Sequence, residues 1–149
     1  MEFIELYVAH VIQMNLIQPA KGTPMRTTYT VIPYYYVDAS NYKQCSEIVL
    51  RGGLSSTERT VIALTLIDEG MFIPFDLGLA IPELQTLMEG FPSSDDHVFH
   101  MLDLHGISEQ MEIPDQATVI EKDAFVAAFA RIGTPQSWDV AAAVDRLHL

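Results

Sequence analysis

The sequence predicts an α+β fold, with a small antiparallel sheet of about three to four strands and helices packed mainly on one face. Three observations support this class. Residues Thr27–Val37 are rich in the Thr, Tyr, Val and Ile that favour strands. Two segments have the capping-box form, a hydroxyl residue followed three positions later by Glu. The order of the expected elements, β-β-α-loop-β-(β)-α-α, suits a small antiparallel sheet with helices on one face.

A length of 149 residues is that of one ordinary domain. We divide the chain into an N-terminal appendage, residues 1–24, and a single α+β domain, residues 25–149. Within the appendage, Met1–Gln18 sets Glu and Gln opposite an apolar stripe, which predicts a helix. Pro19–Pro24 has the Pro and Gly content of a linker.

The first two predicted strands form a hairpin. Pro33 lacks an N–H, so we expect Thr27–Val37 to lie at a sheet edge or to be bulged at that point. Asp38–Lys43 is a polar connection whose Asp, Ser and Asn side chains can close local turns. Glu47–Arg51 follows as a second short strand that ends at two glycines, and we expect the two strands to pair antiparallel.

The first predicted helix begins at the capping box Ser55–Glu58. Apolar residues follow, and Gly70 is expected to end the helix in the left-handed conformation. Met71–Pro82 is apolar but interrupted by Pro and Gly, so it predicts a loop. Pro82 suits the first position of a short helix that ends at Gly90.

The C-terminal part predicts two more strands and two more helices. Asp95–Leu104 is expected to be a strand, and Glu109–Ile113 a strand that returns beside it. Thr118–Glu121 is the second capping box, and the apolar residues after it keep helical spacing as far as Gly133. Thr134 and the proline after it open the last helix.

The net charge of the chain is −12, and its acidic residues are unevenly placed. From Thr60 to Glu121 there is no Lys or Arg. Nucleic acids and anionic membranes are bound through cationic side chains, so we expect neither direct nucleic-acid binding nor membrane binding. A basic protein partner fits this charge, and solubility alone also accounts for it. The twelve acidic residues are Asp68, Glu69, Asp76, Glu83, Glu89, Asp95, Asp96, Asp103, Glu109, Glu112, Asp115 and Glu121.

Three features bear on the cellular compartment. Cys45 is the one cysteine, so no intrachain disulfide can form, which fits a reducing cytoplasm. Glu2 and Glu5 stand where a secretory signal carries Lys or Arg. No apolar run reaches the roughly 18 residues of a membrane-spanning helix. We therefore expect a cytoplasmic protein.

His97 and His100, with Asp95 and Asp96 beside them, carry the side chains that bind zinc and similar ions. A His-x-x-His pair shares one face of a helix but points to opposite faces of a strand, and this segment is predicted as a strand. The spacing matches no familiar ligand pattern, so the sequence predicts neither a metal site nor a cofactor. Motifs of serine catalysis and of phosphate-binding loops are missing, so no enzymatic reaction is indicated.

A polar turn with tyrosines on both sides is a further candidate surface. Tyrosine offers rigid, amphipathic contact area that suits a partner interface. It is also a good strand residue, and Asp, Ser and Asn are ordinary turn residues, so both interpretations stay open. The residues concerned are Tyr34, Tyr35, Tyr36, Asp38, Ser40, Asn41 and Tyr42.

Three short motifs resemble an uncharacterised family of small bacterial and mobile-element proteins. They are Tyr35–Lys43, Phe72–Leu79, and Asp96-His97 with His100. Members of the family carry Tyr-Tyr-x-Asp-Ala-x-Asn-Tyr-Lys, then Phe-Ile-Pro-x-x-x-Gly-Leu-Pro, then Asp-His-x-Trp. The resemblance covers roughly residues 27–129; here a Phe replaces the Trp, and an Ala-Ile pair precedes the last Pro.

The resemblance implies one compact bacterial domain, and it implies no activity. It also directs attention to the polar motif residues that lie in loops, because such residues are often functional. These residues are Asp38, Asn41, Tyr42, Lys43 and His97.

Three functional hypotheses follow. The first is a non-enzymatic interaction protein (an inhibitor, an immunity protein or a phage or plasmid accessory factor) that docks its acidic half or its Tyr-rich strand on a basic or nucleic-acid-binding protein. The second is a small-ligand or metal-dependent enzyme whose site joins Asp38–Lys43 with Asp96, His97 and His100. The third is a structural subunit that dimerises through the Thr27–Val37 edge. The residues expected to bind a ligand or partner are Tyr35, Asp38, Asn41, Tyr42, Lys43, Asp96 and His97.

Overall fold

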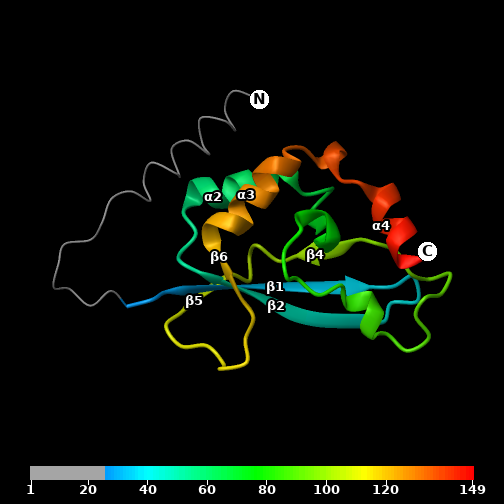
Figure 1. Ribbon diagram of the computed structural model, residues 1–149, viewed down its shortest axis with the longest axis horizontal. Helices are drawn as coiled ribbons and strands as arrows, with labels where there is room; N and C mark the ends of the chain where they lie inside the picture. The colour runs from blue at the N-terminus through cyan, green and yellow to red at the C-terminus, as the bar shows by residue number, and fades with distance from the viewer. Residues whose placement is uncertain (1–25) are drawn as a thin grey trace.

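The computed structural model describes residues 26–149 (Figure 1). The predicted appendage, with its helix Met1–Gln18 and its linker Pro19–Pro24, lies outside the described residues. Within 26–149, no helix has the length and apolar character needed to cross a membrane.

The described chain forms one sheet covered by helices, so the predicted α+β class is confirmed. The sheet is larger than expected, with six strands rather than three to four, and it runs in the order β3-β4-β1-β2-β6 with β5 also paired to β1. It is mixed rather than antiparallel, because β2 and β6 pair in parallel. The strands are β1 Tyr29–Val37, β2 Lys43–Arg51, β3 Met71–Phe72, β4 His100–Leu102, β5 Ser108–Gln110 and β6 Val119–Glu121.

The predicted hairpin is confirmed, and its second strand is longer than expected. β1 and β2 pair antiparallel from Tyr29 opposite Arg51 to Val37 opposite Lys43, so β2 begins four residues before the predicted Glu47. The even-numbered residues of β1 face the helices. The three largest side chains on this face are almost fully buried. They are Ile32, Tyr34 and Tyr36.

The prediction that β1 lies at a sheet edge is wrong, because β2 pairs with one side of it and β4 and β5 with the other. Pro33 is nevertheless tolerated, since β5 pairs with Tyr29–Val31 and β4 with Tyr34–Tyr35, which leaves Pro33 in the gap between them. The Pro33 carbonyl accepts the Asp103 N–H (2.9 Å), while the missing N–H of Pro33 deprives no strand of a partner. The third hypothesis therefore lacks the free edge that it assumed.

The helices α2 Ser56–Thr65, α3 Lys122–Ile132 and α4 Val140–Leu147 lie over the same face of the sheet (Figure 1). The first capping box is confirmed: the Ser55 hydroxyl accepts the Glu58 N–H, and the Glu58 carboxylate accepts the Ser55 N–H. Glu58 also binds Lys122 at the start of α3 (2.9 Å), which ties the two helices together. The helix ends at Thr65, several residues before the expected Gly70.

The second predicted capping box is wrong. Thr118 lies outside any helix, and the residues after it form β6, whose Glu121 is the N-cap residue of α3 without a side-chain capping bond. The predicted end of this helix is confirmed, since Gly133 follows it with a φ of 81°. The last helix begins at Val140, after the short 3₁₀ turn Pro135–Ser137.

The middle of the chain is more irregular than predicted. The expected loop Met71–Pro82 contains β3 and the 3₁₀ turn Pro74–Leu77, and a second 3₁₀ turn, Leu84–Leu87, replaces the expected short helix. The strand expected over Asp95–Leu104 is confined to β4. The returning strand is β5, which pairs with β1 rather than with β4.

The core lies between the helices and the sheet. Phe72, Phe125 and Phe129 are completely buried, and the Phe129 ring contacts the other two at centroid separations of 6.3 Å and 5.0 Å. Trp138 closes this cluster, and its indole N–H donates to the Thr65 carbonyl (2.7 Å). Each such buried ring contributes roughly 2 kcal/mol or more to folding.

Candidate functional site

The structure brings the predicted turn Asp38–Lys43 against the segment Asp95–His97, which is 55 to 60 residues away along the chain. The Ala39 N–H donates to the Asp95 carbonyl (3.1 Å), and the Ser40 hydroxyl donates to the Asp95 carboxylate (2.6 Å). The His97 Nε2 lies 2.7 Å from the Val37 carbonyl. The two segments that the second hypothesis joins are therefore neighbours.

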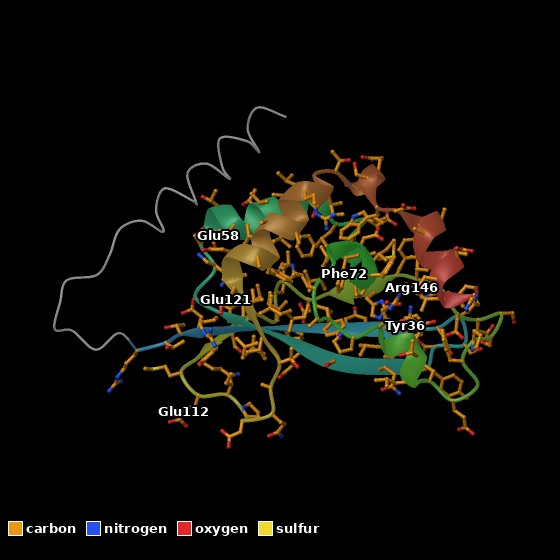
Figure 2. The ribbon with its side chains drawn as sticks, in the orientation of Figure 1. Tyr36, Glu58, Phe72, Glu112, Glu121 and Arg146 are labelled. Carbon is orange, nitrogen blue, oxygen red and sulfur yellow. The ribbon has the colours of Figure 1, made fainter. Side chains whose placement is uncertain are left out.

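Tyr36 lies at the centre of this junction, between the sheet and the loops above it (Figure 2). Its hydroxyl donates to the Asp96 Oδ1 (2.7 Å) and accepts the His97 N–H (3.2 Å). The other oxygen of Asp96 accepts the Ser93 N–H (2.8 Å). Burial, reinforced by the Asp96 carboxylate, raises the pKa of Tyr36 above its ordinary value, so the phenol stays neutral.

His97 and His100, the two histidines of the second hypothesis, have both ring nitrogens engaged with backbone groups. His97 accepts the Phe99 N–H at Nδ1 (3.1 Å), so its Nε2 carries the proton that it donates to Val37. His100 is only 1% exposed, and its Nε2 accepts the Leu84 N–H (2.9 Å). Burial lowers the pKa of His100 to about 4, so this ring is neutral.

These bonds leave neither imidazole an open nitrogen lone pair for a metal ion or a proton transfer. Across residues 26–149, no three His, Cys, Asp or Glu side chains lie close enough together to hold a metal ion. The His97 ring also contacts Tyr36, at a centroid separation of 4.9 Å. The arrangement fixes the Asp95–His97 segment onto the sheet and the hairpin turn.

The remaining predicted site residues either shape the hairpin turn or lie on the surface of the hairpin. Asp38 closes the hairpin turn by accepting the Tyr42 N–H (2.9 Å), and Asn41 occupies the left-handed conformation with a φ of 67°. Tyr42 is 67% exposed, and Lys43 is exposed beside it at the start of β2. Tyr35 alternates with the buried Tyr36 and faces the side of the sheet away from the helices. Tyr42 and Lys43 are thus available to a partner.

Half of the twelve acidic residues between Thr60 and Glu121 are held by internal partners. Arg146 pairs with Glu83 and Arg51 with Glu121, and the other four accept backbone or hydroxyl hydrogen bonds. The six exposed acids without a hydrogen bond or ion pair in the described part of the chain are Asp68, Glu69, Glu89, Glu109, Glu112 and Asp115.

These six acids lie in three places. Asp68 and Glu69 are in the α2–β3 turn, and Glu89 follows the second 3₁₀ turn. The other three are on β5 and on the segment between β5 and β6, which extends from the sheet away from the helices. Glu112 projects from that segment (Figure 2).

The sequence did not indicate a further feature, the outer edge of β2. β6 pairs only with Val49–Arg51, so Lys43–Ile48 has no strand beside it within residues 26–149. At the two ends of the hairpin, the Tyr42 carbonyl accepts the Asp38 N–H and the Gly52 N–H donates to the Thr28 carbonyl, just beyond the two ends of β1. Backbone groups alternate in direction along a strand, so even-numbered residues of β2 point to β1 and odd-numbered ones point outward. The outward-pointing residues of the open edge are Lys43, Cys45 and Glu47.

A cleft of about 480 Å³ lies at one end of this edge, where Ser46–Val49 line it. Ala80–Pro82 forms its wall on the helix side, where the Tyr34 hydroxyl donates to the Pro82 carbonyl (2.8 Å). Pro114–Thr118, from the β5–β6 segment, forms the other wall. Its lining is largely apolar, with Ile48 and Ile120 among the residues that contribute. The cleft thus combines unpaired backbone groups with an apolar surface.

No protein-family model, curated protein or solved structure matches this chain.

Proposed function

We propose that this chain is a non-enzymatic interaction protein that binds an extended, basic segment of a protein partner along the open edge of β2. One observation carries the proposal: the unpaired edge Lys43–Ile48 leads into an apolar cleft, which its last three residues, Ser46–Ile48, help to line. An inhibitor, an immunity protein or a phage or plasmid accessory factor would use such a site.

The edge supplies the hydrogen bonds for strand addition. Three residues with outward N–H and C=O groups match the alternating groups of an added strand, and main-chain bonds of this kind give affinity without requiring one sequence. Apolar side chains of the added strand would enter the cleft beside Ile48 and Ile81, which gives a preference for certain residues.

Charge selects the partner. Asp115 is exposed within the cleft wall Pro114–Thr118 and has no hydrogen bond or ion pair with a described residue, and Glu47 lies on the edge itself. Opposite charges steer association and exclude partners of like charge. A basic strand is therefore favoured over an acidic one, while phosphate backbones are disfavoured.

The enzyme hypothesis receives less support from the same geometry. The segments that it joins are in contact, but the nitrogens of His97 and His100 are occupied by backbone groups. The Asp38 and Asp96 carboxylates likewise hold the turn and the loop in place.

A displayed library of short random peptides, selected on the purified protein, tests the proposal. Enriched peptides are expected to combine Lys or Arg with β-branched residues. Their affinity, measured by fluorescence anisotropy, should fall as salt is added, because salt screens the attraction.

Two variants at one position identify the edge as the site. Cys45→Pro removes an outward N–H without removing a bond to β1, and it should weaken peptide binding about fivefold to tenfold, the equivalent of one hydrogen bond. Cys45→Val keeps the N–H and should bind like the wild type. The fluorescence of the buried Trp138 reports whether each variant is folded. Equal peptide binding by folded Cys45→Pro and Cys45→Val would contradict the proposal.

A further inference from the structure

We infer that a second copy of this chain can occupy the same edge, with the two β2 strands antiparallel about a two-fold axis at Cys45. This inference uses the open edge on which the proposed function rests, and it identifies the chain itself as one occupant. A dimer of this kind would join two six-stranded sheets into one continuous sheet.

The direction of the backbone groups restricts the register. Only the odd-numbered residues of the edge point outward, so an odd-numbered residue must face an odd-numbered residue of the other copy. With the axis at Cys45, Lys43 of each copy faces Glu47 of the other. Both side chains are exposed, and two pairs of opposite charges form.

The other registers are less favourable. An axis at Lys43 sets lysine against lysine, and an axis at Glu47 sets glutamate against glutamate. A shift of two residues in one direction pairs Lys43 with Val49, whose outward groups already bond to β6. The opposite shift pairs Lys43 with Cys45, so neither Lys43 nor Glu47 faces a residue of opposite charge. Charge and hydrogen bonding therefore select the register centred on Cys45.

The cleft receives an apolar side chain in this register. Tyr42 is the most exposed large apolar residue of the hairpin, at 67%, and it falls opposite Ile48 of the other copy. Ile48 lines the cleft together with Ile81 and Pro82. A cleft of about 480 Å³ is large enough for the tyrosine ring.

The length of the open edge also fits. β2 begins at Lys43, and the paired segment Lys43–Glu47 ends two residues before Val49, where β6 begins to pair. The hairpin turn then leads each chain back toward its own β1 and away from β6 of the other copy.

Dimerisation would cover the cleft, so a second copy and a basic partner would exclude each other. The two states should respond to salt in opposite ways. Two chains of net charge −12 repel each other at low ionic strength, and salt screens that repulsion. Salt should therefore favour the dimer and weaken the binding of the basic partner.

Charge exchange tests the register. Lys43→Glu and Glu47→Lys each place like charges opposite each other, and each variant alone should dimerise at least tenfold more weakly than the wild type. An equimolar mixture of the two restores both opposite pairs, as does the double variant K43E/E47K, which keeps the wild-type net charge. Light scattering over a wide concentration range measures the dissociation constant.

Cys45 provides an independent readout because it is the only cysteine of the chain. In the proposed register the two Cys45 Cα atoms lie roughly 5.5 Å apart, within reach of a disulfide. Mild oxidation should cross-link the wild type and the mixture of the two charge variants, but neither variant alone. Cross-linking that is equal in all samples, or a wild type that stays monomeric at every concentration and salt level, would overturn the inference.

The two proposals can fail separately. A monomeric wild type that still loses peptide binding on Cys45→Pro would overturn the dimer and support the partner site. A charge-dependent dimer in a protein for which the library yields no binding peptide would support the dimer and overturn the partner site.

Discussion

The burial of His100 makes stability depend on pH in a range where few other groups titrate. The His100 ring is 1% exposed, and its Nε2 accepts the Leu84 N–H, an arrangement that only the neutral ring can maintain. Its pKa is lowered from 6.5 to about 4 in the folded protein, mainly by burial. Between these two values the unfolded chain binds the proton and the folded chain does not, so stability falls as the pH decreases.

The magnitude follows from that shift. A pKa lowered from 6.5 to about 4 corresponds to about 3 kcal/mol of stability, which is lost completely only below the folded pKa of about 4. Between about pH 7.5 and about pH 5 the loss is about 2 kcal/mol, since the unfolded histidine is by then almost fully protonated. This is a large fraction of the stability of an ordinary domain.

Urea unfolding followed by the fluorescence of Trp138, the one tryptophan, measures this loss. His100→Gln supplies a matched control, because its side-chain oxygen can accept the Leu84 N–H and does not titrate. The wild type should lose about 2 kcal/mol more than the variant over this pH range. His105→Gln, at an exposed position, should keep the wild-type profile. Equal losses in the wild type and His100→Gln would refute the reasoning.

Two further substitutions test contacts near the same loops by urea unfolding. Tyr36→Phe removes the hydroxyl that binds Asp96 and should lower the free energy of unfolding by about 1–2 kcal/mol; an unchanged value would mean that water replaces the hydroxyl without loss. Gly106→Ala places a Cβ 2.5 Å from the Asp103 carboxylate and 3.1 Å from Pro33. This substitution should lower the free energy of unfolding by about 1–3 kcal/mol. No loss would show that the Asp103 turn rearranges freely.

Local sequence signals predicted the parts of the fold that depend on local chemistry. The capping box Ser55–Glu58 and the strand composition of β1 each reflect interactions between residues close in sequence, and both are confirmed. The same pattern failed at Thr118–Glu121, where its residues belong to β6. Val119 and Ile120 favour a strand, and pairing with β2, some 70 residues earlier, decides the outcome. That partner is not visible in a short window of sequence.

The candidate site was predictable only in part for the same reason. The interest in Asp38–Lys43 and in Asp96–His97 rested on their side chains, and the structure brings these segments together. His97 accepts an N–H at Nδ1 and His100 accepts one at Nε2. These roles depend on how the loops pack in the folded chain. The open edge of β2 depends on where β6 stops pairing, which only the assembled sheet determines.

An open strand edge needs protection against indiscriminate pairing, and the residues on this edge bear on what the edge does. Natural proteins protect such edges with charged side chains, proline or bulges, because unpaired backbone groups template aggregation. An edge that only needed protection would be well served by like charges, which repel in every register. Lys43 and Glu47 carry opposite charges with Cys45 midway between them. That arrangement opposes self-pairing in the like-charge registers and favours it in one, and the exposed Tyr42 then meets the cleft. We therefore regard this edge as a binding surface whose charges select the occupant and fix its register.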